Sequence, residues 1–171
     1  MWRKIVWSSL IVLAAGAFVA AVSVASGPDD TVGIGFLDVA DLQVPSSRGQ
    51  FAGTGVQMQG RLALHANGCV TVVLDGVERM PLWPDGTDVF QDPKDLSRYV
   101  VNLPGDVTLD VDDVSADRFS AVGVIDKADA TFAMQAERLP EKVSSFIAYC
   151  GVEAAPVAFP DAATFVLRGT S

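Results

Sequence analysis

The sequence has little of what most catalytic and nucleic-acid-binding sites are built from. It contains one histidine, two cysteines and 12 Lys and Arg against 21 Asp and Glu, for a formal net charge of −9. The scarcity of basic residues argues against a nucleic-acid partner, because such binding needs positive side chains to neutralise phosphates. One histidine with two cysteines is too few for a zinc site, which usually takes three or four such ligands.

Motifs typical of enzymes are also missing. There is no G-x-S-x-G elbow, and Gly33-x-Gly35 and Gly53-x-Gly55 do not continue into a G-x-G-x-x-G nucleotide loop. His65, just before the Asn67-Gly68 turn, is therefore expected to be an ordinary strand-end residue. We predict no catalytic residue and no cofactor. The alternative is a small carboxylate-dependent envelope hydrolase, but the abundant Asp and Glu residues do not single out the two acids that it would need.

The sequence contains only one long apolar run, which excludes a membrane protein with several spans. The run 5–24 carries no charge and follows Arg3 and Lys4. It is long enough to cross a membrane, which favours a transmembrane signal anchor at residues 5–25. The alternative is a signal peptide cleaved near Ala25. Both interpretations place the rest of the chain outside the cytoplasm, either as a single-pass protein of the cell membrane or as a secreted one.

Alternating apolar and polar residues and frequent turn signals fill most of the remaining chain. We divide it into segment 1–25, a linker 26–52 with a short strand around 32–36, and a β-rich domain 53–171. In that domain the pattern predicts strands, one helical turn at 94–98 and one longer helix at 140–149. The predicted strands are 56–64, 69–74, 77–83, 99–103, 107–111, 118–125 and 164–167.

These elements indicate a mainly β fold. Short strands separated by turns and joined to one helix are typical of a small OB-like barrel or sandwich. We expect five or six strands, one helix in the C-terminal half, and the N-terminal transmembrane helix outside the domain. The helix presents Val143, Phe146, Ile147 and Cys150 on one face, at spacings of three and four residues.

The two cysteines, Cys69 and Cys150, are predicted to form a disulfide. Both lie in the exported part of the chain, where such bonds form and persist. Cys69 opens a predicted strand and Cys150 ends the predicted helix on its apolar face. The bond would therefore join the helix to the strands.

Ligand-binding residues are harder to identify from the pattern. Asp110, Asp112 and Asp113 are weak candidates for calcium, because an acidic segment supplies oxygen ligands. The alternation of Val107, Leu109 and Val111 instead makes it a solvated strand face, and no metal is predicted. Trp83 is the sole tryptophan outside the N-terminal run. It would either contact a ligand such as a sugar ring or cap the end of the core.

Three stretches resemble a family pattern. The first is Gly68-Cys69-Val70-Thr71-Val72, the second is Leu82-Trp83-Pro84-Asp85-Gly86-Thr87, and the third is Leu103-Pro104-Gly105-Asp106. The first two resemble the G-C-L-x-L … W-P-x-G-T core of small, uncharacterised, β-rich proteins that are secreted or membrane-anchored in high-GC Gram-positive bacteria. The third, with Asp112-Asp113-Val114, resembles the L-P-x-G … G-D-x-V segment that follows this core. The resemblance covers roughly residues 55–151. It implies export and a β-rich fold, and it implies no activity.

The sequence thus predicts a non-catalytic, membrane-anchored extracytoplasmic domain that acts as an envelope interaction or structural module. Its expected partners are the membrane, through residues 5–25, and an envelope protein or glycan, with no nucleic acid. Besides the hydrolase, a calcium-stabilised structural domain is the other alternative.

Overall fold

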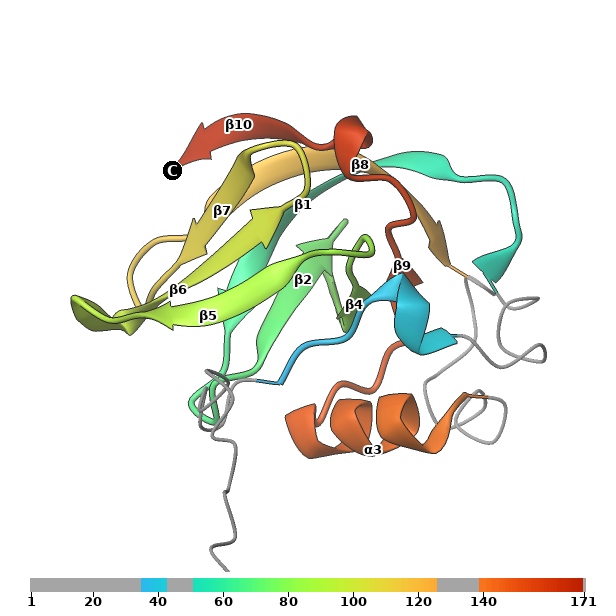
Figure 1. Ribbon diagram of the computed structural model, residues 1–171, viewed down its shortest axis with the longest axis horizontal. Coiled ribbons are helices and arrows are strands. Elements are labelled where there is room, and N and C mark those ends of the chain that lie inside the picture. The colour runs from blue at the N-terminus through green and yellow to red at the C-terminus, as the bar shows by residue number, and fades with distance from the viewer. Residues whose placement is uncertain (1–34, 43–50, 126–138, 171) are drawn as a thin grey trace, which may run out of the picture. The chain divides into compact units, whose positions relative to one another are not determined.

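The computed structural model describes residues 35–42, 51–125 and 139–170 (Figure 1). They belong to a compact unit that spans Thr31–Ser171. No helix among the described residues is long and apolar enough to cross a membrane. The predicted anchor or signal peptide at residues 5–25 and most of the predicted strand at 32–36 lie outside the described residues.

The described residues are mainly β, with strands forming a nearly closed, barrel-like sheet beside one α-helix. The described residues contain ten strand segments rather than the five or six expected. They are β1 (Val56–Leu64), β2 (Val70–Leu74), β3 (Val77–Arg79), β4 (Pro81–Leu82), β5 (Asp88–Asp92), β6 (Asp95–Leu103), β7 (Val107–Val111), β8 (Asp117–Ile125), β9 (Val157–Ala158) and β10 (Val166–Thr170). The helical elements are η1 (Val39–Leu42), α3 (Glu141–Cys150) and η4 (Ala162–Thr164).

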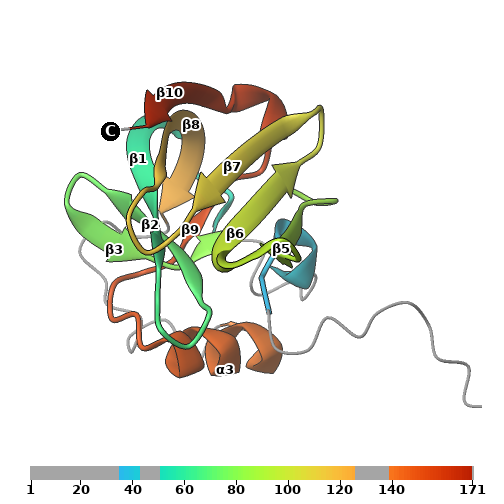
Figure 2. The same cartoon turned by 90° about the vertical axis from the view of Figure 1, so that its left-hand side faces the viewer.

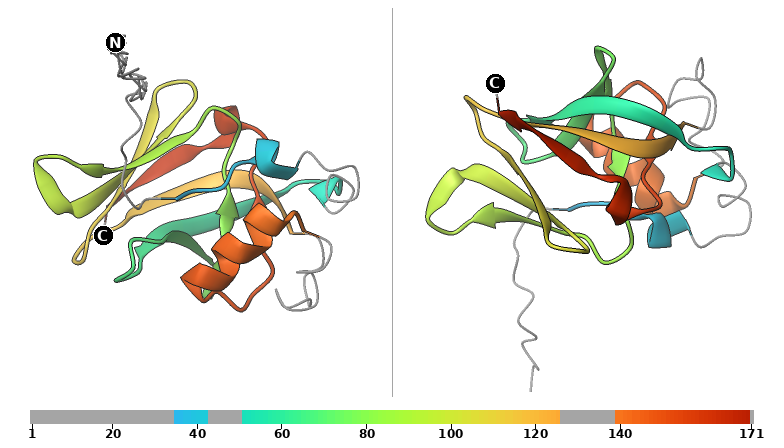
Figure 3. Two further views of the ribbon diagram at one scale, coloured as in Figure 1. Left: turned by 60° about the horizontal axis from the view of Figure 1, so that its bottom comes forward. Right: turned by 90° about the horizontal axis from the view of Figure 1, so that it is seen from above.

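Seven of the strands form one sheet in the order β3-β2-β1-β8-β9-β4, with β10 also pairing β8. The other three form the sheet β5-β6-β7. Figures 2 and 3 show β1, β8 and β10 side by side, on the opposite side of the fold from α3. This arrangement decides which side chains from distant parts of the chain meet.

The hairpins β1–β2 and β2–β3 confirm the predicted meander. Both pairs are antiparallel, with Leu62 opposite Val72 and Leu74 opposite Val77. In the second turn Asp75 has φ 50° and Gly76 has φ 80°. Two successive residues with positive φ give the tight turn that matches strand twist, and Asp-Gly tolerates that conformation best.

The predicted third strand, 77–83, is wrong in its extent. It breaks at Met80 into β3, which pairs with β2, and β4, which pairs in parallel with β9. Pro81 has no backbone N–H, so it cannot continue the ladder with β2. β4 pairs instead with the two-residue strand β9, which was not predicted from the sequence.

The helical turn predicted at 94–98 is also wrong. These residues belong to a hairpin in which β5 pairs antiparallel with β6. At its tip, Asp92 accepts a hydrogen bond from the Lys94 N–H at 2.8 Å and Asp95 accepts one from the Ser97 N–H at 3.1 Å. Nearly every side chain at this tip is polar and exposed, so no apolar alternation marks it as a strand.

Two apolar clusters form the core. The first lies between the sheets and includes the rings of Phe119, Phe159 and Phe165. The second lies between the sheet and α3, where Val143 and Ile147 are completely buried. Leu37 and Leu42 join this second cluster, so residues that the sequence analysis assigned to the linker 26–52 pack into the domain.

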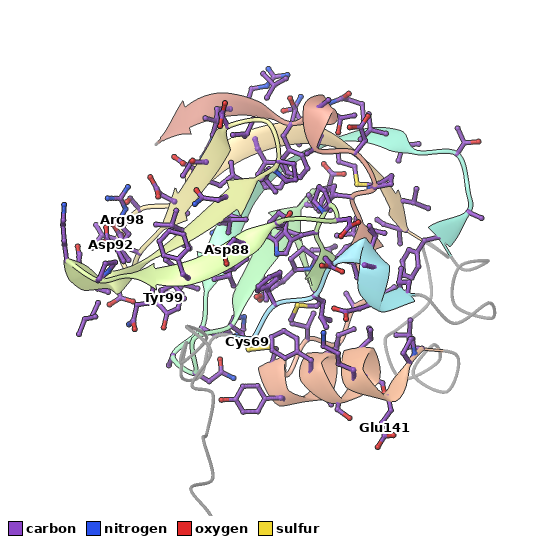
Figure 4. The ribbon with its side chains drawn as sticks, in the orientation of Figure 1. Cys69, Asp88, Asp92, Arg98, Tyr99 and Glu141 are labelled. Carbon is purple, nitrogen blue, oxygen red and sulfur yellow. A yellow bond between two sulfur atoms is a disulfide. The ribbon has the colours of Figure 1, made fainter. Side chains whose placement is uncertain are left out.

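Helix α3 confirms the predicted helix, and the predicted disulfide is confirmed as well. Pro140 precedes the helix, and Gly151 ends it in the left-handed conformation. Cys69 and Cys150 are bonded, with their Cα atoms 5.8 Å apart. Figure 4 shows Cys69 beside the helix. The bond joins the residue just before β2 to the last residue of α3, so it links the helix to the strands as expected.

Candidate functional site

Trp83 is not a surface ligand contact. Its side chain is only 1% exposed. The indole packs against Phe159 and Phe165, with ring centroids 6.0 and 6.2 Å away. The suggested stacking on a ligand is therefore wrong, and the tryptophan is a core residue, which was the other interpretation.

Two of the three aspartates considered for calcium, Asp110 and Asp112, make contacts that hold local structure. Asp110 forms an ion pair with Arg98 at 2.5 Å. Arg98 also lies 3.5 Å from Asp92, and Figure 4 shows these two side chains together near the tip of the β5–β6 hairpin. Asp112 accepts hydrogen bonds from the Val114 N–H at 2.7 Å and the Ser115 N–H at 2.6 Å, which hold the loop between β7 and β8.

Asp113 is exposed on the same loop. No group of three or more His, Cys, Asp or Glu side chains that could hold a metal ion occurs among residues 35–42, 51–125 and 139–170.

His65 contacts a carboxylate, but in an arrangement unlike a catalytic triad. Its Nε2 atom is hydrogen-bonded to Oε1 of Glu78, and the Thr71 hydroxyl donates to the same oxygen. Burial opposes ionisation of Glu78, but the hydrogen bonds from Thr71 and His65 and the charges of His65 and Arg61 outweigh it and lower the pKa of Glu78. The carboxylate separates the hydroxyl from the imidazole, so His65 cannot act as the base for Thr71.

A concentration of arginine that the sequence analysis missed lies on the outer face of the larger sheet. Arg61 of β1 is the direct cross-strand partner of Arg118 of β8. Direct partners on antiparallel strands point to the same face. Because the neighbouring Leu62 and Phe119 point into the core, both arginines point outward, and both are exposed.

Arg168 joins this pair through an irregularity in β10. Leu167 lies opposite Phe119 and Thr170 opposite Asp117, so Arg168 and Gly169 together face the single residue Arg118. This is a β-bulge, and Gly169 takes the positive φ of 79° within it. Bulges change the direction of a side chain and are frequent beside functional sites. Here the Nε atom of Arg168 donates to the Ser120 hydroxyl at 3.3 Å, which holds the guanidinium over β8.

The three arginines line one open basin of about 660 Å³, which we call the arginine basin. The other lining residues include Gly60 and Asp75. No described Asp or Glu oxygen lies within 4.0 Å of a guanidinium nitrogen of Arg61, Arg118 or Arg168. Three of the seven Lys and Arg side chains in the described residues thus converge without an ion-pair partner among them.

This convergence has an electrostatic cost. Like charges directly opposite each other on paired strands destabilise a sheet. Two unit charges about 5 Å apart repel each other by roughly 1 kcal/mol in water. A chain with 21 acidic residues has many carboxylates that could neutralise them. An anion bound in the basin would remove the repulsion, so the arrangement is well suited to binding an anion.

A second basin of about 440 Å³ adjoins the first and shares Arg61 and Arg118 with it. Its other wall is the β7–β8 loop, which contributes Asp112 and Asp113. The surroundings of Arg61 and Arg118 therefore include carboxylates. The cross-strand row itself continues from Arg61 through Val73 to Glu78.

Comparisons of the chain with protein-family models, with curated proteins and with solved structures give no match.

Proposed function

We propose that this protein is a non-catalytic binding domain, displayed outside the cytoplasm, that holds an anionic ligand in the arginine basin. The observation that carries this proposal is the convergence of Arg61, Arg118 and Arg168 from three neighbouring strands, without an ion-pair partner among the described residues. Arginine is the side chain best suited to such a site, because its planar fork donates two parallel hydrogen bonds to a carboxylate or phosphate.

The location of the domain is part of the same proposal. The disulfide supports export, because such bonds persist in oxidising compartments and are rare in the cytosol. The apolar run 5–24 would serve either as a membrane anchor or as a signal peptide cleaved near Ala25. We also propose that the barrel has an OB-like arrangement. We further propose that the chain belongs to the secreted or membrane-anchored β-rich proteins of high-GC Gram-positive bacteria that its sequence resembles.

The ligand would be an envelope protein or glycan that carries acidic groups. With a net charge of −9, the chain as a whole repels anions. A ligand would therefore be selected by its fit to the basin rather than attracted by the overall field. The same net charge disfavours nucleic acid and a tight contact with an anionic membrane surface.

A carboxylate-dependent hydrolase receives less support. A general acid requires a carboxyl group with a raised pKa. The two carboxylates of the second basin do not offer this: hydrogen bonds from Ser115 and Val114 lower the pKa of Asp112, and Asp113 is exposed. The calcium-stabilised alternative has the same weakness, because the oxygens of Asp112 already accept bonds from the loop.

Titration of the purified full-length chain in detergent with a panel of small anions tests the proposal. Backbone amide NMR shifts at Gly60, Phe119 and Arg168 would report binding. We expect at least one anion to bind saturably, and the double variant Arg61→Gln/Arg118→Gln to lose that binding. Lys94→Gln removes one positive charge at an exposed position away from the basin and serves as the control. Equal binding by the double variant, or no saturable binding by the wild type, would contradict the proposal.

A further inference from the structure

The arginine basin has a geometry that discriminates between kinds of anion. Its three guanidinium-bearing residues lie on three adjacent strands, β1, β8 and β10. Neighbouring strands are about 4.8 Å apart, so the row of attachment points spans about 10 Å. The three guanidinium groups are therefore carried on separate attachment points along this row. A group that contacts all three must present several acceptor oxygens, arranged around a centre or along a short chain.

A carboxylate does not meet that requirement. Its two oxygens lie in one plane, and a single arginine fork can occupy both of them. A phosphate monoester has three terminal oxygens and a charge of −1.5 to −2 near neutral pH. A diphosphate has more oxygens and a longer reach. Both offer acceptors to two or three forks at once, and both carry enough charge to offset the repulsion between Arg61 and Arg118.

The surroundings of the row limit the length of the ligand. Asp112 and Asp113 line the adjoining basin together with Arg61 and Arg118, and Glu78 lies at the end of the cross-strand row opposite Arg168. Asp75 also lines the basin. An extended polyanion would place its later charges against these carboxylates. A compact anionic group would stay within the row.

We infer, on the basis of the proposed function, that the group recognised in the arginine basin is a compact phosphate, either a phosphomonoester or a diphosphate. The basin of about 660 Å³ is larger than a phosphate alone, so it has room for part of the molecule that carries it. A soluble or glycan-borne phosphate fits the acidic chain better than a lipid headgroup in an anionic membrane.

The anion preference of the full-length chain tests this inference. The probes are pyrophosphate, inorganic phosphate, sulfate, acetate and long-chain polyphosphate, compared at constant ionic strength by isothermal titration calorimetry. We expect pyrophosphate to bind tightest, about tenfold or more above acetate, which corresponds to about 1.4 kcal/mol. Sulfate, which shares the tetrahedral oxygens and the charge of a phosphomonoester, should bind more tightly than acetate, and long-chain polyphosphate should bind no more tightly per site than pyrophosphate. Acetate binding as tightly as pyrophosphate would overturn the inference but leave the proposed function standing, whereas failure of every anion would overturn both.

The variant Arg168→Lys separates fork geometry from charge. It keeps the positive charge but loses the planar fork and the Nε donor to Ser120. We expect a severalfold loss of pyrophosphate affinity with little change in acetate affinity, and no change in the melting temperature. Lys94→Arg is the control, because it makes the reverse exchange outside the basin. Unchanged pyrophosphate affinity in Arg168→Lys would show that the basin recognises only the charge of the anion, and this would overturn the inference.

A vesicle experiment distinguishes the sources of the phosphate. Phosphatidylcholine vesicles with and without phosphatidic acid present the same phosphomonoester on a lipid. We expect the wild type and Arg61→Gln/Arg118→Gln to bind both kinds of vesicle alike, since any remaining affinity would come from residues 5–25. Phosphatidic-acid binding that depends on the two arginines would overturn the assignment to a soluble or glycan-borne phosphate.

Discussion

The side of the domain that carries α3 and the side that carries the arginine basin are built in contrasting ways. On the helix side, a disulfide and a cluster of completely buried residues, including Val143 and Ile147, join the sheet to the helix. On the basin side, Arg61 and Arg118 are paired directly across two strands, and a bulge adds Arg168. The first side gains stability from apolar burial and a covalent bond, whereas the second gives up stability through charge repulsion. A local loss of stability of this kind is typical of functional sites.

The largest difference between the two sides should appear when the covalent bond is removed. The disulfide closes a loop with a sequence separation of 81 residues. The chain-entropy model predicts that replacing both Cys69 and Cys150 with alanine lowers the free energy of unfolding by about 4.5 kcal/mol. Urea denaturation of the oxidised wild type and the double variant measures this. A loss below about 1 kcal/mol would show that the bond contributes little, contrary to this account.

A smaller loss of stability should follow when one side chain is truncated in the apolar cluster beneath α3. Ile147 is fully buried on the inner face of α3, so Ile147→Ala removes apolar contacts and leaves a cavity. We expect a destabilisation of about 2–5 kcal/mol, toward the lower end if the helix relaxes. Tyr149→Ala is the control on the same helix, since that side chain is 63% exposed and should change stability by only about 0.5 kcal/mol. Similar losses for both variants would contradict the assignment of the helix faces.

On the basin side, Gly169→Ala tests the bulge. The φ of 79° is unfavourable for a residue with a Cβ, while no heavy atom lies within 4 Å of the position that the Cβ would occupy. The cost should therefore come from the backbone alone, about 1 kcal/mol. Anion affinity should fall as well, because relaxing the bulge moves Arg168. Unchanged affinity together with reduced stability would mean that the bulge has no part in placing that arginine.

The smallest expected effect is the acid sensitivity of Glu78, at the end of the arginine row. Because the folded state lowers its pKa from 4.5, the carboxylate contributes stability above that value and loses the contribution as the pH falls through the lowered folded pKa. The wild type should thus lose stability below about pH 4.5 more steeply than Glu78→Gln. Denaturation midpoints between neutral and acidic pH measure the difference. Parallel curves for the two proteins would argue against a stabilising role of the carboxylate bonds to Thr71 and His65.

Local features of the fold were predictable wherever one short segment contains the whole signal. Each such feature depends on residues within a few positions of each other. Examples are the turns at Asn67-Gly68 and Asp75-Gly76, the strand 56–64 and the apolar face of the helix. The disulfide was predictable because only one pairing of two cysteines exists. The hairpin tip at 94–98 was not, since exposed polar strands lack apolar alternation.

The arginine basin could not be predicted because its members are far apart in the chain. Arg61, Arg118 and Arg168 come together only through the pairing of β1 with β8 and of β8 with β10, and strand order was beyond the pattern. Each arginine occupies the polar face or end of its strand, where solvated charges are ordinary. The one local hint was the Arg168-Gly169 dipeptide near the end of a predicted strand, because glycine within a strand often marks a bulge.

The central claim is that the row of Arg61, Arg118 and Arg168, which has no ion-pair partner among the described residues, is retained in order to bind an anion. Its most direct test is the free energy of unfolding of the wild type and Arg61→Gln/Arg118→Gln, each measured with and without pyrophosphate at constant ionic strength. Without pyrophosphate, the double variant should be at least as stable as the wild type, because the repulsion is gone. With pyrophosphate, the wild type alone should become more stable, since a ligand that binds only the folded state stabilises it. A double variant that is less stable without the anion, or that gains as much from it as the wild type, would contradict the account.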